Sequence, residues 1–336
     1  MSESEVLENL HTVSKPAPHD PVLSNFPLPL RAVYYPLGFA IEIATNSSEV
    51  LDAAQESWGQ SRQSFYTTPV QLEIGVIGDG STECPPPPTT HSRSHLMSTY
   101  ADSENFSVSD MSRGFAFAWL TQSAVSNRAY FRYYFLEAAG LTMLGALHMT
   151  PLHAACVQVD GKGVLLCGES GAGKSSLAFA CARAGWKFLT DDGSAIVRER
   201  PGRLVVGNPH QMRFRESAIE LFPELKNQRV TPRATGKMAI EVATETLPGI
   251  DMISECQVDH IVFLNRREPS PRGLFPVAKE VGLQYFEHCI CFGEKEVREA
   301  QIASIHNLLT AQTVEMRYQD LDWAIGRLET LVREGV

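Results

Sequence analysis

The sequence predicts an α/β protein in which a smaller N-terminal α+β region precedes a larger C-terminal α/β region. Two patterns lead to this expectation. Residues 26–150 contain short apolar and alternating runs between helical patterns, whereas residues 151–336 open with a strand, a glycine-rich loop and a helix in direct succession. A chain of 336 residues, 43% hydrophobic and 20% charged, is long enough for two regions of ordinary size and apolar enough to bury a core.

Charge and composition narrow the class of partner. The chain has 29 Lys and Arg against 39 Asp and Glu, a net charge of -10, which argues against a general nucleic-acid binder because such proteins need a basic surface. The acidic N-terminus lacks the features of a secretory signal. The longest apolar stretch, residues 129–147, contains Arg132 and Glu137, so a buried helix is favoured over a membrane span. We expect a cytoplasmic protein without membrane contact, and seven scattered cysteines fit a reducing compartment.

The N-terminal region is expected to follow a disordered leader, residues 1–25, in which Pro, Ser, His and acidic residues show no periodicity. Asn46-Ser47-Ser48 supplies cap candidates for a helix that ends near Trp58. Four prolines from Pro85 onward, followed by a Ser/Thr/His-rich run to Ser94, predict a surface loop, because proline cannot donate to a sheet ladder. Apolar and alternating runs predict strands at residues 39–44, 70–76 and 115–120.

A long helix is expected over residues 128–148. Its apolar side chains recur at helical spacing, and such a stripe is more often core than an aromatic binding platform. We therefore expect this helix to pack the N-terminal region onto the C-terminal one. The apolar stripe comprises Tyr130, Tyr134, Phe135, Ala138, Leu141, Leu144 and Leu147.

The C-terminal region alternates strands and helices around the glycine-rich loop. Residues 164–167 form a continuous apolar run, as expected of a strand buried on both faces. Gly185 marks the end of the helix that follows the loop. The predicted strands are residues 154–159, 164–167, 187–190, 238–242 and 260–264, and the predicted helices are residues 175–184, 294–309 and 320–333.

The glycine-rich loop carries the strongest chemical signal. Its residues match the pattern Gly-x-x-x-x-Gly-Lys-Ser, in which backbone amides and the start of a helix bind phosphate oxygens. Lys174 is expected to neutralise β- and γ-phosphate charge, and the Ser175 hydroxyl to ligate Mg²⁺. The alternative, a chance glycine turn, is disfavoured because a strand precedes the loop and a helix follows it. The candidate nucleotide-binding residues are Gly168, Glu169, Ser170, Gly171, Ala172, Gly173, Lys174, Ser175 and Ser176.

Two adjacent carboxylates, Asp191 and Asp192, close the next predicted strand. In a doubly wound sheet this position is the carboxyl edge, beside the bound phosphates. One carboxylate could reach the metal while the other accepts a proton from an attacking hydroxyl. An Asp-Asp-Gly surface turn without chemistry is the alternative interpretation.

Together, the loop, its helix, Gly185 and residues 188–192 resemble the catalytic domain of HPr kinase/phosphorylase. Phosphoenolpyruvate carboxykinases have a similar loop and paired aspartates, with a related nucleotide-binding core. The resemblance is close over residues 152–197 and loose beyond. It implies a P-loop kinase domain over residues 151–336, preceded by an N-terminal α+β domain, residues 26–150, of unknown role.

The resemblance also implies roles for individual residues. Asp191 would be the catalytic base, Asp192 and Ser175 would contact Mg²⁺ or its waters, and Lys174 would contact the phosphates. His153 is similar to the histidine that this family places at the entry to its kinase domain, and would lie near the transferred phosphoryl group. A histidine at the start of a strand with no chemical role is the alternative interpretation.

Two departures from the family pattern leave the site incomplete. Ser176 stands where the family usually has Glu, and the later glutamate-containing signature is absent. Residues 213–216 (Arg-Phe-Arg-Glu) and 237–241 (Lys-Met-Ala-Ile-Glu) could each supply a cation and a carboxylate, and spacing does not choose between them.

These features predict an ATP- and Mg²⁺-dependent kinase that acts on a hydroxyl, foremost on Ser or Thr of a protein or peptide. The alternatives are a kinase of a small hydroxylated molecule and a nucleotide-binding regulatory module with weak catalysis. Carboxykinase chemistry is disfavoured because no second metal and carboxylate-binding constellation is recognisable. HPr kinases assemble into hexamers, which makes a homo-oligomer conceivable.

Overall fold

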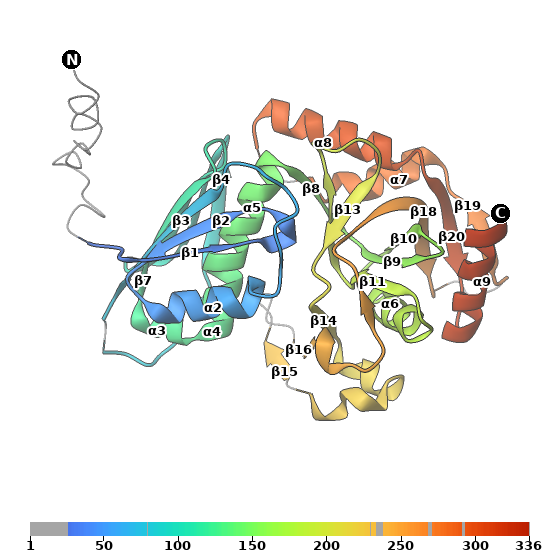
Figure 1. Ribbon diagram of the computed structural model, residues 1–336, viewed down its shortest axis with the longest axis horizontal. Coiled ribbons are helices and arrows are strands. Elements are labelled where there is room, and N and C mark those ends of the chain that lie inside the picture. Colours follow the sequence, from blue (N-terminus) through green and yellow to red (C-terminus); the bar gives the residue numbers. More distant parts are fainter. Residues whose placement is uncertain are drawn as a thin grey trace, which may run out of the picture.

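The computed structural model describes residues 26–335 except 79, 229, 233–237, 268–270 and 291–292. The expected disordered leader, residues 1–25, lies outside the described residues. An N-terminal sheet and a C-terminal sheet lie side by side, with a small three-stranded sheet below them (Figure 1). The described chain is thus a mixed α/β structure, as the sequence predicts.

The N-terminal sheet has seven strands in the order β1-β2-β3-β7-β6-β5-β4. β2, β3 and β7 are parallel, and the other neighbours are antiparallel. Buried positions alternate along β6 and β7, so one face of the sheet packs on helices. The elements are β1 (Leu30–Tyr34), a 3-10 turn (Pro36–Gly38), β2 (Ile41–Thr45), α2 (Ser48–Trp58), β3 (Val70–Ile77), β4 (Thr89–Arg93), β5 (Leu96–Asp102), β6 (Asn105–Asp110), β7 (Phe115–Thr121) and α3 (Gln122–Ser126).

The expected surface loop up to Ser94 is wrong in its second half, because Thr89–Arg93 forms the edge strand β4. All five residues of β4 are exposed and pair only with β5. No apolar periodicity can mark such a strand, since neither of its faces is buried. Backbone pairing in the hairpin makes it a strand.

The helix expected over residues 128–148 is present, but its middle turn is a π-helix. It comprises α4 (Arg128–Phe131), the π-helical turn (Arg132–Glu137) and α5 (Ala138–Leu147). Phe135 and Leu144 are buried in the N-terminal core as expected, whereas Leu141 is 38% exposed. Placing Leu141 in the core was therefore wrong. It lines a cavity between the N- and C-terminal halves.

The C-terminal sheet is mixed and not a uniformly parallel, doubly wound sheet. Its order is β17-β11-β9-β10-β18-β13-β12-β8, with β20 beside β18 and β19 beside β20. β9 is antiparallel to both β10 and β11. Its strands are β8 (Met149–His153), β9 (Ala155–Val159), β10 (Lys162–Cys167), β11 (Lys187–Thr190), β12 (Gly193–Val197), β13 (Leu204–Gly207), β17 (Asp251–Met252), β18 (Glu255–Asn265), β19 (Gly273–Pro276) and β20 (Gln312–Arg317).

A two-residue turn explains the inserted antiparallel strand. Asp160 and Gly161 both have positive φ, 50° and 77°, the backbone that a type I′ hairpin turn requires. A hairpin of this length must join antiparallel neighbours. Since β9 is antiparallel to both strands beside it, β10 and β11 still end at the same edge of the sheet.

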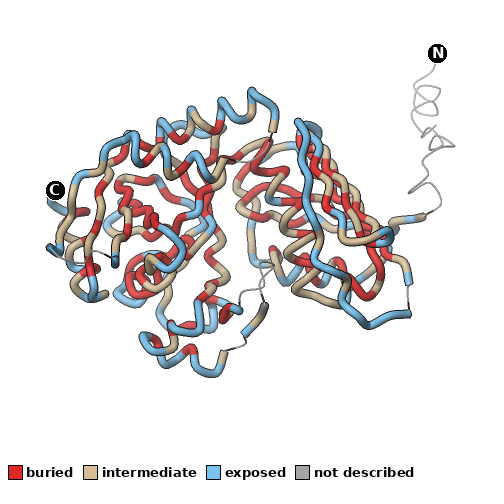
Figure 2. The backbone as a smooth tube through the Cα atoms, turned by 180° about the vertical axis from the view of Figure 1, so that it is seen from behind, coloured by how far each residue is buried: buried red, intermediate tan, exposed pale blue. Residues whose placement is uncertain are grey.

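Helices cover both faces of this sheet. Alternate residues of β9 and β10 pack on opposite sides, with Val164 and Leu166 in the core beneath α6 and α9, and Leu165 and Cys167 in the core beneath α7 and α8. This explains the continuous apolar run of β10. The helices are α6 (Lys174–Arg183), α7 (Lys279–Glu287), α8 (Lys295–Leu308) and α9 (Leu321–Glu334). Seen from behind, buried segments run through the middle of both halves (Figure 2).

The small sheet places charged side chains near the loop. It consists of β14 (Gln211–Phe214), β16 (Met238–Ala243) and β15 (Val230–Pro232), and short 3-10 turns (Glu216–Glu220, Pro223–Asn227, Thr244–Thr246) flank it. Met212 and Phe214 are buried in the α6 core. Because side chains alternate along a strand, Arg213 faces away from that core. Among the described residues, no helix is long and apolar enough to cross a membrane.

Candidate functional site

The glycine-rich loop joins the end of β10 to the start of α6. Gly168, Gly171 and Gly173 have φ values of 145°, 93° and 99°, which L residues with a Cβ rarely adopt. At Gly173 a Cβ would also lie 2.6 Å from the Tyr318 hydroxyl. The loop backbone therefore requires glycine at these positions, and α6 directs its N-terminal amides toward the adjoining cavity.

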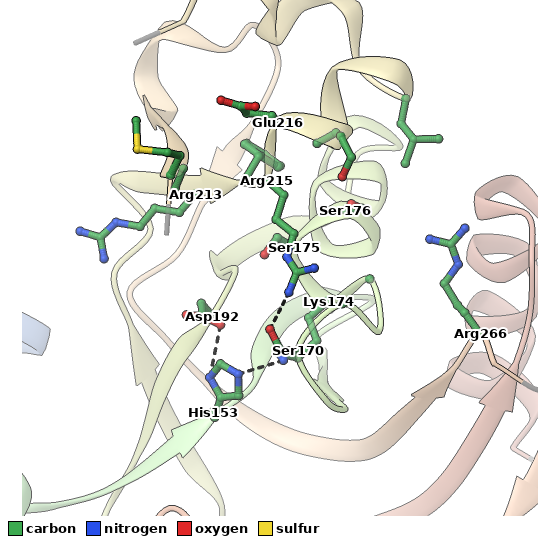
Figure 3. Close-up of a pocket in the computed structure, with 18 residues that line it drawn as sticks. His153, Ser170, Lys174, Ser175, Ser176, Asp192, Arg213, Arg215, Glu216 and Arg266 are labelled. Carbon is green, nitrogen blue, oxygen red and sulfur yellow. Dashed lines mark hydrogen bonds and ion pairs between the residues drawn. The ribbon is translucent and has the colours of Figure 1, made fainter. Parts of the chain in front are cut away.

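Lys174, His153 and Asp192 form a connected chain of polar groups (Figure 3). Lys174 is 6% exposed, and its Nζ donates to the Gly168 carbonyl at 2.8 Å and lies 3.1 Å from His153 Nε2. His153 Nδ1 lies 3.3 Å from an Asp192 carboxylate oxygen. Because an ammonium can only donate, Nε2 accepts from Lys174, which assigns the ring proton to Nδ1, facing Asp192. Burial lowers the pKa of Lys174, and the Asp192 charge partly opposes this.

Asp191 is the most perturbed carboxyl of the site. It directly follows β11, is 5% exposed, and accepts the backbone N–H of Arg213 at 3.0 Å. The Ser175 hydroxyl donates to its backbone carbonyl at 3.3 Å. Burial raises the pKa of Asp191 to about 6; the Arg213 N–H lowers it and the Asp192 charge raises it. A carboxyl with such a pKa is suited to accept a proton near neutral pH.

A cavity of about 620 Å³ opens in front of the loop. Its charged lining consists of Lys174, three arginines and two carboxylates, a net positive charge if His153 is neutral. The positive lining and the helix N-terminus favour an anionic ligand. The lining includes His153, Ser170, Gly171, Gly173, Lys174, Ser175, Ser176, Asp192, Arg213, Arg215, Glu216 and Arg266.

Four of the predicted site residues do not line this cavity. Glu169 points into solvent, with its side chain 71% exposed and paired with Arg267 at 2.7 Å. The Gly168 and Ala172 carbonyls are engaged by Lys174 and by Tyr318, respectively. Asp191 faces a neighbouring cavity.

Both segments that could complete the site reach the cavity, the second through Met238 and Ala239, but the glutamate of the second segment does not line it. Arg213, Arg215 and Glu216 all line the cavity, and Arg215 Nη2 donates to the Ser170 hydroxyl at 2.6 Å. Lys237 lies outside the described residues. Glu241 is absent from the cavity lining and pairs with Arg213 across the small sheet.

Three residues that line the cavity or contact the loop were not predicted from the sequence. Arg266 lines the cavity directly after β18, which is parallel to β10, so a basic residue ending a second apolar strand was the available signal. Tyr285 and Tyr318 contact the loop backbone through their hydroxyls, at Gly168 and Ala172. Both tyrosines come from distant helix and strand ends, and no local pattern marks them.

Comparison with known proteins shows a similarity over the part of the chain that contains the glycine-rich loop. Residues 146–220 match the family model described as HPr Serine kinase C-terminal domain. HPr kinase/phosphorylase of Clostridium botulinum is 42% identical over 60 residues, 18% of this chain and 19% of that protein. The protein of the same name from Halalkalibacterium halodurans is 40% identical over 60 residues, also 18% and 19%. Over this segment the chain is therefore similar to the HPr kinases.

The similarity to these proteins covers only part of each sequence. The match spans about a fifth of the length of these curated relatives. The solved Hpr(Ser) kinase/phosphatase from Coxiella burnetii overlays on 55% of this chain and 93% of its own, with 16% identity and a TM-score of 0.30.

Proposed function

We propose that this chain is a phosphotransferase that moves the γ-phosphoryl group of ATP onto a hydroxyl group, with Mg²⁺ as cofactor. The observation that carries the proposal is the placement of the Asp191-Asp192 pair at the sheet edge where the glycine-rich loop begins. The relationship to HPr kinases over residues 146–220 supports the same reaction class.

The nucleotide phosphates would lie in the cavity of about 620 Å³. The loop and the first turn of α6 bring backbone amides to the cavity lining, although the Gly168 and Ala172 N–H groups already donate to the Tyr285 hydroxyl and the Glu169 carbonyl. Lys174 and Arg215 supply positive charge. Since Lys174 already donates to the Gly168 carbonyl, its ammonium is held at the base of the loop before a ligand binds.

Ser175 and Asp192 fit the requirements of a magnesium site. Both line the same cavity and offer a hydroxyl and a carboxylate oxygen, the ligand types that Mg²⁺ prefers. Mg²⁺ usually takes only one or two protein ligands beside phosphates and water. When bound, the ion would neutralise phosphate charge. His153 would hold Asp192 in place through its Nδ1–H.

Asp191 would act as the general base. The acceptor oxygen forms a bond to the γ-phosphorus, the bond from that phosphorus to the β,γ-bridging oxygen breaks, and the hydroxyl proton passes to Asp191. The products are a phosphate ester and ADP. The Arg213 N–H keeps one carboxylate oxygen of Asp191 fixed, which leaves the other for the proton.

The residues that would bind the phosphates do not determine which molecule receives the phosphoryl group. The similar proteins are HPr kinases, which makes a serine of a protein one candidate acceptor. A small hydroxylated molecule is the other candidate within the same reaction.

The test measures nucleotide binding and phosphoryl release from labelled ATP with Mg²⁺, using the chain and its Lys174→Met variant. Removing the ammonium should lower kcat/KM by about 10²–10³-fold, because it is placed to stabilise phosphate charge. Lys187→Met, which changes an exposed lysine at the start of β11, is the matched control and should match the parent. ATP binding without any turnover by the parent would contradict a kinase and favour a nucleotide-binding module.

A further inference from the structure

A second cavity lies on the other side of the Asp191-Asp192 pair. Its volume is about 270 Å³. It shares Asp192 and Arg213 with the cavity of about 620 Å³ in front of the loop, which we call the nucleotide cavity. Of the two cavities, only the second is lined by Asp191. The proposed base therefore faces this second cavity, which we call the acceptor pocket.

The acceptor pocket exists because the two halves of the molecule pack together. One wall comes from the 3-10 turn after β1, the end of α2 and the helix α5, including Leu37, Trp58 and Leu141. The facing wall comes from β8 and from the turn between β11 and β12. Figure 1 shows α5 and β8 where the two sheets meet. The N-terminal half thus contributes directly to the surroundings of Asp191.

An ion cluster centred on the buried Arg132 supports this wall. The Arg132 side chain is 5% exposed and contacts Glu56 at 2.5 Å, Glu137 at 3.1 Å and Glu241 at 3.5 Å. Arg213, whose N–H holds Asp191, lies 3.4 Å from Glu241. Burial alone would lower the pKa of Arg132, but Glu137, Glu56 and Glu241 together raise it, so the guanidinium stays charged.

The π-helical turn supplies both Arg132 and Glu137 to this cluster. Such turns are rare and frequently found at functional sites. The turn presents Glu137 to the pocket and also carries Tyr133, whose hydroxyl donates to Glu241 at 2.7 Å. A continuous set of contacts therefore leads from this helix to the proposed base.

Size and charge restrict what the pocket can hold. At about 270 Å³ it lies just below the range of about 300–1,000 Å³ usual for drug-sized ligands. Its charged lining consists of Glu137, Asp191 and Asp192 against Arg213 alone. Three carboxylates and one cation disfavour an anion. Ser57, Ser61, Ser194 and Asn208 offer hydrogen bonds, and Trp58 and Leu141 offer apolar surface.

We propose that the acceptor pocket binds a small, uncharged or cationic alcohol and presents its hydroxyl to Asp191 for phosphorylation. This inference rests on the proposed kinase function and names its substrate class. A serine on a folded protein would have to enter between the two halves with its flanking residues, for which a pocket of this volume has little room.

The experiment offers the full chain labelled ATP, Mg²⁺ and four probes: ethanolamine, glucose, glycerate and a serine-containing peptide. Leu141→Trp fills the pocket from α5, and Ser61→Trp fills it independently from the segment after α2. Leu96→Trp is the matched control, since Leu96 is 45% exposed and lies on β5, outside both cavities.

We expect transfer to ethanolamine or glucose and not to glycerate or the peptide. Either filling variant should raise the KM for that probe at least about tenfold, with ATP affinity and the melting temperature unchanged. Transfer to glycerate or the peptide alone, transfer to none of the probes despite ATP binding, or a KM insensitive to both variants would overturn the inference. Failure to bind ATP at all would instead contradict the proposed function, so the two failures are distinguishable.

Discussion

The nucleotide cavity and the acceptor pocket meet at Asp192 and Arg213, yet they differ in charge and in origin. The nucleotide cavity is lined by four Lys and Arg residues and two carboxylates, whereas the acceptor pocket is lined by one arginine and three carboxylates. Residues 170–176 contribute six of the residues that line the nucleotide cavity. The acceptor pocket is assembled from several segments between Pro36 and Arg213.

The difference in charge and origin fits two different tasks, binding of the nucleotide phosphates and deprotonation of the acceptor alcohol. A polyanion needs backbone amides and cations, which a single loop and helix start can provide. An alcohol that must lose a proton needs a base with a raised pKa, which requires burial, and burial comes from tertiary packing. The two cavities should therefore respond to different substitutions.

The largest effect should follow Asp191→Asn. Without the carboxylate the proposed acceptor of the hydroxyl proton is lost, so turnover should fall by about 10²–10⁴-fold. The nucleotide Kd should stay unchanged, because Asp191 does not line that cavity. In the parent, activity should fall as pH drops through about 6, where Asp191 becomes protonated. Steady-state rates from pH 5 to 8 and nucleotide titrations measure both effects.

Asp251→Asn, at an exposed position on β17, is the control for this substitution and should keep the parent profile. If Asp191→Asn retained both the rate and the acid limb, the base would have to lie elsewhere and the separation of the two cavities would fail.

The sequence predicts the nucleotide cavity better than the acceptor pocket for the same reason. The loop, Lys174 and the Asp191-Asp192 pair are recognisable because neighbouring residues carry the pattern. The acceptor pocket depends on Arg132, Glu137 and Leu141, which look like interruptions or members of an apolar stripe when only helical periodicity is considered. Strand β4 depends on hairpin pairing, and β9, although predicted as a strand over residues 154–159, takes its antiparallel place in the sheet from the Asp160-Gly161 turn.

The next largest effect should be the loss of stability in Arg132→Met. Removing the buried cation takes the Arg132 contacts away from Glu137, Glu56 and Glu241, and Arg213 and Arg128 remain as their other cations. Loss of one partner from a buried ion pair typically costs about 3–5 kcal/mol. Chemical denaturation measures the change in the free energy of unfolding. Arg113→Met, at a side chain 84% exposed, should cost under about 1 kcal/mol. Equal effects of the two variants would show that the cluster does not fix the pocket wall.

Asp191→Asn should also stabilise the fold, and in a pH-dependent way. The folded-state pKa of about 6 exceeds the ordinary value of 3.8, so the ionised carboxylate destabilises the folded state above about pH 6. This penalty shrinks as pH falls below 6 and is small near pH 4, where the folded state is protonated and the unfolded state is close to half protonated. A shift of about two pH units corresponds to up to about 3 kcal/mol gained at pH 8. Denaturation curves at pH 8 and pH 4 test the sign, and a gain that is larger at pH 4 would contradict it.

The smallest effect should follow Arg215→Ala, and it should be confined to the nucleotide side. Arg215 contacts the Ser170 hydroxyl at 2.6 Å and lines the nucleotide cavity but not the acceptor pocket. Loss of one partly exposed, charge-assisted contact should raise the KM for ATP about tenfold, which corresponds to about 1.4 kcal/mol. The KM for the acceptor should not change. Arg62→Ala, at an exposed position, serves as the control. A variant that weakened both substrates equally would indicate that the two cavities act as one site, because only a shared structural change could reach the acceptor from Arg215.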